Sequence, residues 1–151
     1  MNYHIPMYKL SLVRDGALCA ERQTVASSRD LYPILREYYA HHDREEMLVV
    51  LLDSKHKIVG INSVSVGSLS LSIVHPRETF KAAIVGNCSA IILAHNHPSG
   101  DPTPSPEDRA LTERLVKGGE ILGIPVLDHL VIGDGRYISF SDKGWMPSTT
   151  A

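Results

Sequence analysis

Two short apolar runs constrain the fold of this chain more than any other feature. Residues 47–52 read Met-Leu-Val-Val-Leu-Leu, and residues 89–94 read Ser-Ala-Ile-Ile-Leu-Ala. Neither run approaches the roughly 20 residues that a membrane-spanning helix needs. Both have the length and the β-branched and Leu content of strands that are buried on both faces, which requires a sheet covered on each side. The sequence therefore predicts an α/β fold.

Helical patterns alternate with these runs. Apolar residues recur at helical spacing over residues 27–42, 76–86 and 105–123. Further strands are expected over residues 57–66, 69–74, 126–132 and 136–140, and the last two flank the hairpin signal Gly133-Asp134-Gly135. This order of elements predicts a mixed β-sheet flanked by helices.

The N-terminal part carries a hairpin signal of its own. Strand-like residues 9–13 and 17–25 bracket Asp15-Gly16, a dipeptide that favours a tight turn. We therefore expect residues 1–43 to form a hairpin and a helix of the same domain, residues 44–145 to form its core, and residues 146–151 to form a frayed tail.

Composition narrows the classes of function. The chain has 151 residues, enough for one domain, and 15 Lys and Arg against 17 Asp and Glu leave a formal net charge of −2. This balance indicates no basic face for nucleic acid and no cationic helix for a membrane surface, although the net charge does not say how the charges are distributed. Cys19 and Cys88 are far apart, and no basic and apolar leader is present, so we expect a cytoplasmic protein with reduced thiols.

A group of metal-ligand residues follows the second apolar run. His95 and His97 are two residues apart at the end of a predicted strand, so both imidazoles point to the same side of the sheet. Asp108 lies on the first turn of the next predicted helix, where its carboxylate can face the strand end. Three protein ligands leave one position of a tetrahedral zinc ion open for water, which is typical of a catalytic site. We predict one zinc ion per chain.

A hydrolase also needs a proton shuttle and a donor to the oxyanion. Glu45, at the start of the first apolar strand, is our candidate general base, although a register slip of one residue would place Glu46 there instead. Ser105 is the candidate oxyanion donor, and Ser105-x-x-Asp108 is also close to a capping box. His129 is interpreted as a support for the site or as structural, rather than as catalytic.

These residues resemble a known motif. Glu45, then His95-x-His97-Pro98, then Ser105-x-x-Asp108 beginning seven positions after Pro98, is similar to the JAMM motif of the MPN-domain metalloproteases. The flanking sequence is similar to the RadC-like branch of that superfamily over about residues 44–145. The further matches are Val74 to Glu78, Ala94 to Gly100, Leu111-Thr112, Leu127-Asp128-His129, Ser139-Phe140 and Gly144-Trp145.

The resemblance implies an MPN/JAB fold with cytidine-deaminase-like layering, zinc held by His95, His97 and Asp108, Glu45 as the base and Ser105 as the oxyanion donor. It also implies hydrolysis of peptide or isopeptide bonds in a peptide or protein substrate. Full-length RadC-like proteins carry an N-terminal helix-hairpin-helix region that this chain does not show. Two alternatives stay open, a zinc-binding MPN scaffold without turnover and an accessory role in DNA repair.

Overall fold

A mixed five-stranded sheet with helices on both faces forms the protein, as the sequence predicts. The computed structural model describes residues 1–67, 69 and 73–148. Among these residues no helix is long and apolar enough to cross a membrane. Along the chain the elements are α1 (Ser28–Tyr39), β1 (Glu46–Leu52), β2 (Ile58–Val66), α2 (Pro76–Thr79), α3 (Lys81–Val85), β3 (Ala90–Asn96), α4 (Pro106–Leu122), β4 (Val126–Ile132) and β5 (Tyr137–Ser139).

The strands follow the order β2-β1-β3-β4-β5 across the sheet. Only β3 and β4 pair in parallel, and α4 makes the crossover between them. The other neighbours pair antiparallel, so β4 and β5 form the predicted hairpin at one edge. The two apolar runs of the sequence are β1 and β3, the central strands.

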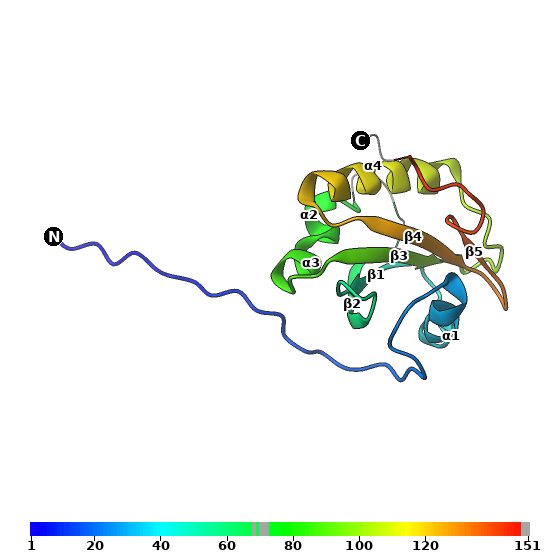
Figure 1. Ribbon diagram of the computed structural model, residues 1–151, viewed down its shortest axis with the longest axis horizontal. Coiled ribbons are helices and arrows are strands. Elements are labelled where there is room, and N and C mark those ends of the chain that lie inside the picture. The colour runs from blue at the N-terminus through cyan, green and yellow to red at the C-terminus, as the bar shows by residue number, and fades with distance from the viewer. Residues whose placement is uncertain (68, 70–72, 149–151) are drawn as a thin grey trace.

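Helices cover both faces of these central strands (Figure 1), and an apolar cluster lies on each face. One face of β1, with Met47, Val49 and Leu51, packs beneath α2, α3 and α4. The other face, with Leu48 and Val50, packs against α1. Because both faces are covered, every residue of β1 and β3 is buried, which explains why neither strand alternates between apolar and polar residues.

Near the C-terminal end of α4, Gly119 packs directly against the backbone of Ile124. Gly119 is buried, and a Cβ there would come within 2.5 Å of the carbonyl oxygen of Ile124. At the neighbouring Gly118 the nearest atoms, on Phe80 and Pro76, would be 3.4 Å away, which is ordinary contact. The two adjacent glycines therefore differ in what a methyl group would meet.

We expect Gly119→Ala to lower the free energy of unfolding by about 1–3 kcal/mol, because the extra methyl forces the helix end away from residue 124. Gly118→Ala is the matched control, and the better helix propensity of alanine should leave stability unchanged or raise it by up to about 1 kcal/mol. Urea denaturation of both variants measures this difference. Equal stability of the two would contradict the close packing of Gly119.

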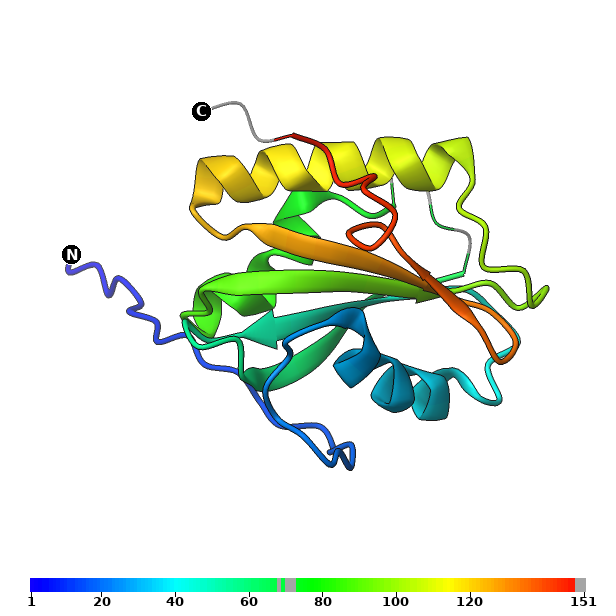
Figure 2. The same cartoon turned by 45° about the vertical axis from the view of Figure 1, so that its right-hand side comes forward.

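The predicted N-terminal hairpin is wrong. Residues 9–23, all of which the structure describes, form no strand (Figures 1 and 2). Strand-like pairing begins only at Thr24, which bridges to Lys57 beside β2. A two-stranded hairpin is marginal unless one of its faces packs on something, and here the large side chains of Tyr8, Leu10 and Val13 stay exposed.

Two smaller expectations also changed. The strand predicted over residues 69–74 falls largely outside the described residues, and the described Leu69, Ile73 and Val74 are in no strand. The helix predicted over residues 76–86 is divided at Phe80 into α2 and α3. Phe80 is fully buried beneath α4, so packing sets the position of this break.

Candidate metal centre

The two histidines converge where β3 leaves the sheet. His95 is in β3 and shares its face with Leu93, which packs beneath α4. The amide of His97 donates to the Ile132 carbonyl at 2.9 Å, so extended pairing with β4 continues past the end of β3. Both imidazoles therefore point to the same side, and their Nε2 atoms lie 3.0 Å apart.

Asp108 completes the cluster from the first turn of α4. Its Oδ2 lies 3.2 Å from Nε2 of His97 and 3.4 Å from Nε2 of His95. Zinc bound tetrahedrally at about 2.1 Å separates its ligand atoms by about 3.4 Å. The three atoms are already close to that spacing, and His95, His97 and Asp108 together could hold one metal ion.

Local sequence fixes the position of Asp108. Ser105 caps α4, its hydroxyl accepting from the Asp108 amide at 3.0 Å, while Oδ2 of Asp108 accepts from the Ser105 amide at 2.9 Å. This reciprocal pair is the capping box that the sequence indicated. In the cap the Ser105 hydroxyl acts only as an acceptor, so its own proton stays available for donation to another group.

The Asp108 carboxylate is ionised at neutral pH. Burial raises the pKa of Asp108, but its contacts with the imidazoles of His95 and His97 and the hydrogen bond from the Ser105 amide outweigh burial and hold that pKa far below its usual range. The contact with the Asp108 carboxylate, opposed by burial, raises the pKa of His97, and the charge of Glu45 adds to this rise. An ionised carboxylate beside two imidazoles is a suitable set of donors for a divalent cation.

A buried chain of hydrogen bonds determines which ring nitrogen of His95 faces the cluster. Thr112 donates its only hydroxyl proton to the Asp108 carbonyl at 2.8 Å, so its oxygen must accept from Nδ1 of His129 at 2.6 Å. Burial, followed by the charge of His95, lowers the pKa of His129 well below its usual value, so this ring is neutral. Its Nε2 then accepts from Nδ1 of His95 at 2.7 Å, and Nε2 of His95 is left to bind metal.

The surrounding loop orients His97 in the same way. Nδ1 of His97 lies 2.8 Å from the Asp101 carbonyl and donates to it, which leaves Nε2 facing the cluster. The amide of Asp134 holds this loop through the Gly100 carbonyl at 2.9 Å. A side chain at Gly133 would overlap that carbonyl oxygen, so the tip of the β4–β5 hairpin must be glycine for the loop to close.

We expect Thr112→Val to weaken zinc binding by about 10–100-fold, since valine keeps the shape but removes the hydroxyl that sets the His129 tautomer. Thr112→Ser retains the hydroxyl and should bind zinc like the wild type. Competition with a chromogenic chelator measures the affinities. Equal affinity of the valine and serine variants would contradict the proposed hydrogen-bond chain.

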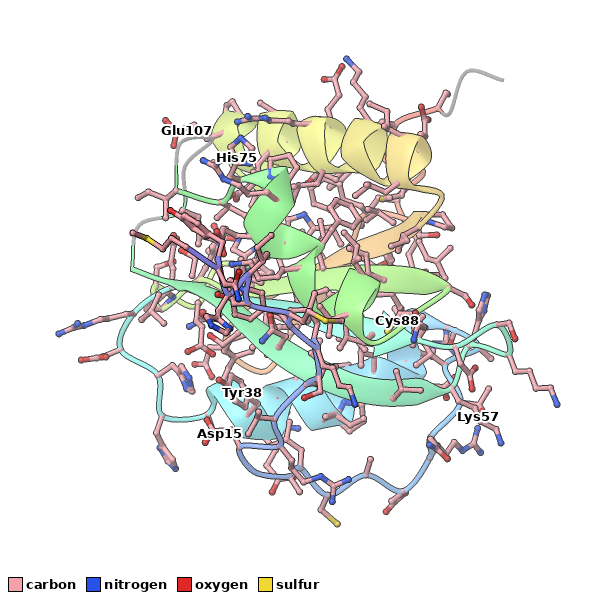
Figure 3. The ribbon with its side chains drawn as sticks, turned by 90° about the vertical axis from the view of Figure 1, so that its left-hand side faces the viewer. Asp15, Tyr38, Lys57, His75, Cys88 and Glu107 are labelled. Carbon is pink, nitrogen blue, oxygen red and sulfur yellow. The ribbon has the colours of Figure 1, made fainter. Side chains whose placement is uncertain are left out.

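The faces of β1 distinguish the two candidate bases. Glu46 is buried on the α1 side, where it accepts a hydrogen bond from the Tyr38 hydroxyl and lies 3.7 Å from Nε2 of His42. Figure 3 shows Tyr38 on the α1 side of the sheet, away from Glu107 at the start of α4. Glu46 is therefore directed away from the metal-ligand cluster.

Glu45 has the opposite orientation because strand side chains alternate. Met47, two residues further on, packs beneath α4 and pairs with His95. Glu45 thus lies on the side of the sheet that carries both histidines, and its charge contributes to the raised pKa of His97. It is half-buried, which leaves its carboxylate accessible to water.

Sequence reasoning left Thr112 and Asn96 without a role. Thr112 is four residues after Asp108 on one face of α4, and this helical spacing was the available signal. The side chain of Asn96 bonds to the backbone of Arg44 and Glu46, about 50 positions earlier in the chain. A pattern within a few residues cannot predict contacts over such a separation.

The fold and the cluster define an α/β domain with a candidate mononuclear metal centre. A family model described as a RadC-like JAB domain matches residues 25–145. The chain is 55% identical over 125 residues to a UPF0758 protein of Caldanaerobacter subterraneus, an alignment of 83% of this chain and 54% of that protein. It therefore belongs to the RadC-like JAB domain family.

Relatives occur in other bacteria and in archaea. A UPF0758 protein of Desulfitobacterium hafniense is 55% identical over 123 residues, with 82% of this chain and 54% of that protein aligned. One of Methanococcoides burtonii is 47% identical over 125 residues, with 83% and 55% aligned. The chain thus spans about half the length of the curated relatives it matches.

Proposed function

We propose that this chain is a zinc-dependent hydrolase of peptide or isopeptide bonds. The observation that carries the proposal is the convergence of His95, His97 and Asp108 on one point, with the Glu45 carboxylate on the same side of the sheet. Two imidazoles and one carboxylate form a ligand set of catalytic zinc sites, which keep one position open. A scaffold has no need of the added carboxylate.

His95, His97 and Asp108 would hold the metal. When bound, zinc supplies a Lewis acid that polarises a carbonyl group and lowers the pKa of water to about 7. The His95 side chain is fully buried, whereas 13% of the His97 side chain and 9% of the Asp108 side chain are exposed, so solvent reaches the cluster beside these two residues. The charge of Glu45 reaches this same side.

The chain's own groups divide the proton transfers of amide hydrolysis. The Glu45 carboxylate takes a proton from the attacking water and delivers it to the leaving nitrogen. The Ser105 hydroxyl, held at the start of α4 by its cap to Asp108, donates to the oxygen of the attacked carbonyl. His129 stays neutral and keeps the tautomer of His95 fixed through the reaction.

A substrate screen tests the proposal. The purified chain is stripped of metal with a chelator, divided, and restored with zinc in one portion, and both portions are incubated with a peptide library and with isopeptide-linked lysine substrates. We expect cleavage only after zinc is restored. Full zinc binding without cleavage of any member would instead support the zinc-binding scaffold.

A further inference from the structure

Asn96 lies between the two histidines in sequence but faces the other side of the sheet. It is the last residue of β3 and is only 4% exposed. Ala94, two residues earlier, packs in the cluster against α1, and side chains of a strand alternate. The Asn96 side chain therefore projects away from the metal-ligand cluster.

The side-chain amide of Asn96 bridges β3 and the segment that enters β1. Its Oδ1 accepts from the amide of Glu46 at 2.8 Å, and its Nδ2 donates to the carbonyl of Arg44 at 2.9 Å. These two backbone groups flank Glu45. The carbonyl of Glu45 itself accepts from the amide of Gly67 at 2.7 Å, so the backbone is held before, at and after this residue.

Glu45 needs such support because it precedes the regular part of β1. The register with β3 begins at Met47, so β-ladder pairing with the histidine strand does not reach residue 45. A general base must lie within hydrogen-bond reach of the proton it moves, and a misplacement of 1 Å can lower a rate by about 10²-fold. Asn96 is buried at the end of β3, the middle strand of the sheet, where it pairs with Ile132 of β4.

We propose that Asn96 is a positioning residue that sets the distance between Glu45 and the histidines. The strand segment His95-Asn96-His97 then presents metal ligands on one face and fixes the base with the residue on the other face. This inference rests on the proposed role of Glu45 in hydrolysis. It gives a reason for asparagine at this position, since the side-chain amide carries its acceptor and its donor on two separate atoms, as the bridge to Glu46 and Arg44 uses them.

Measurements of backbone dynamics test, without any substrate, whether the Asn96 hydrogen bonds hold the backbone of Glu45. In the full chain as purified, ¹⁵N relaxation should give a rigid Glu45 amide, with an order parameter of about 0.85, in the wild type. Asn96→Ala removes both hydrogen bonds, and Asn96→Asp keeps the acceptor but loses the donor to Arg44. We expect the Glu45 order parameter to fall below about 0.6 in Asn96→Ala and to an intermediate value in Asn96→Asp.

Tyr39→Phe is the matched control. The Tyr39 hydroxyl also bridges β1 and β3, lying 2.9 Å from the Glu46 carbonyl and 3.2 Å from the Ala94 carbonyl, but it does not bracket Glu45. Its loss should reduce stability without changing the order parameter of Glu45. An unchanged Glu45 in both Asn96 variants would overturn the proposal.

Kinetics with a substrate from the screen provide the second readout. We expect both Asn96 variants to keep the wild-type zinc content, to lose about 10-fold to 100-fold in kcat and to keep KM nearly unchanged. Loss of zinc, or a mobile Glu45 with unchanged kcat, would overturn the positioning role. If the wild type bound zinc without any turnover, the proposed function would fail, and the order parameters alone would decide whether Asn96 holds Glu45.

Discussion

Glu45→Gln is expected to lower peptide hydrolysis by about 10²–10⁴-fold while the protein keeps its bound metal. Glutamine preserves the shape of the side chain but cannot accept a proton from water. None of the three metal-ligand residues is altered, so the zinc content should match that of the wild type. Initial rates on a cleaved peptide, with zinc measured by mass spectrometry on the same samples, give both quantities.

Glu46→Gln is the matched control for this prediction. Glu46 is adjacent in sequence and equally acidic, but it bonds to the Tyr38 hydroxyl on the α1 side. We expect Glu46→Gln to change turnover by less than about tenfold, and to act mainly on the packing of α1. Full activity in Glu45→Gln, or a larger loss in Glu46→Gln, would contradict the assignment of the base.

His97→Ala is expected to abolish stoichiometric metal binding. The wild type should carry about one zinc ion per chain, whereas the variant loses the ligand whose Nε2 lies within 3.2 Å of both other ligand atoms. Since metal stabilises only the folded state, zinc at 1,000 times its Kd should raise the unfolding free energy of the wild type by about 4 kcal/mol. The same addition should not stabilise the variant.

His41→Ala controls for nonspecific zinc binding by histidine. His41 is exposed at the end of α1 and is not part of the cluster. Its replacement should leave both the zinc content and the rise in unfolding free energy on addition of zinc at wild-type values. Absence of metal from the wild type after zinc has been added back would contradict the site and remove the basis of the hydrolase proposal.

Short-range patterns predicted much of the fold and the ligand triad. The two central strands followed from apolar runs, because a strand covered on both faces has no polar side. His95 and His97 share a direction in any extended strand, since side chains alternate with a period of two. Ser105 and Asp108 form a capping box within one helical turn, so their placement needed no knowledge of the rest of the chain.

Other features depended on contacts between distant parts of the chain. The Asp15-Gly16 signal is local, but whether its flanking residues become strands depends on a surface to pack against, and the side chains of Leu10 and Val13 stay exposed. The sequence left Glu45 and Glu46 as alternatives, because a shift of one residue reverses every side chain of a strand. Packing of Met47 beneath α4 decided which face each glutamate occupies.

The sequence by itself therefore determined the candidate ligand residues and the elements that carry them, because periodicity and capping act within a few residues. Only the tertiary structure decided how the site is supported. The hydrogen bonds between His129 and Thr112, and those that join Asn96 to Arg44 and Glu46, link residues 17 to 52 positions apart. Such buried polar contacts exist only once the sheet and helices have packed, since burial is what brings the partners together and excludes competing water.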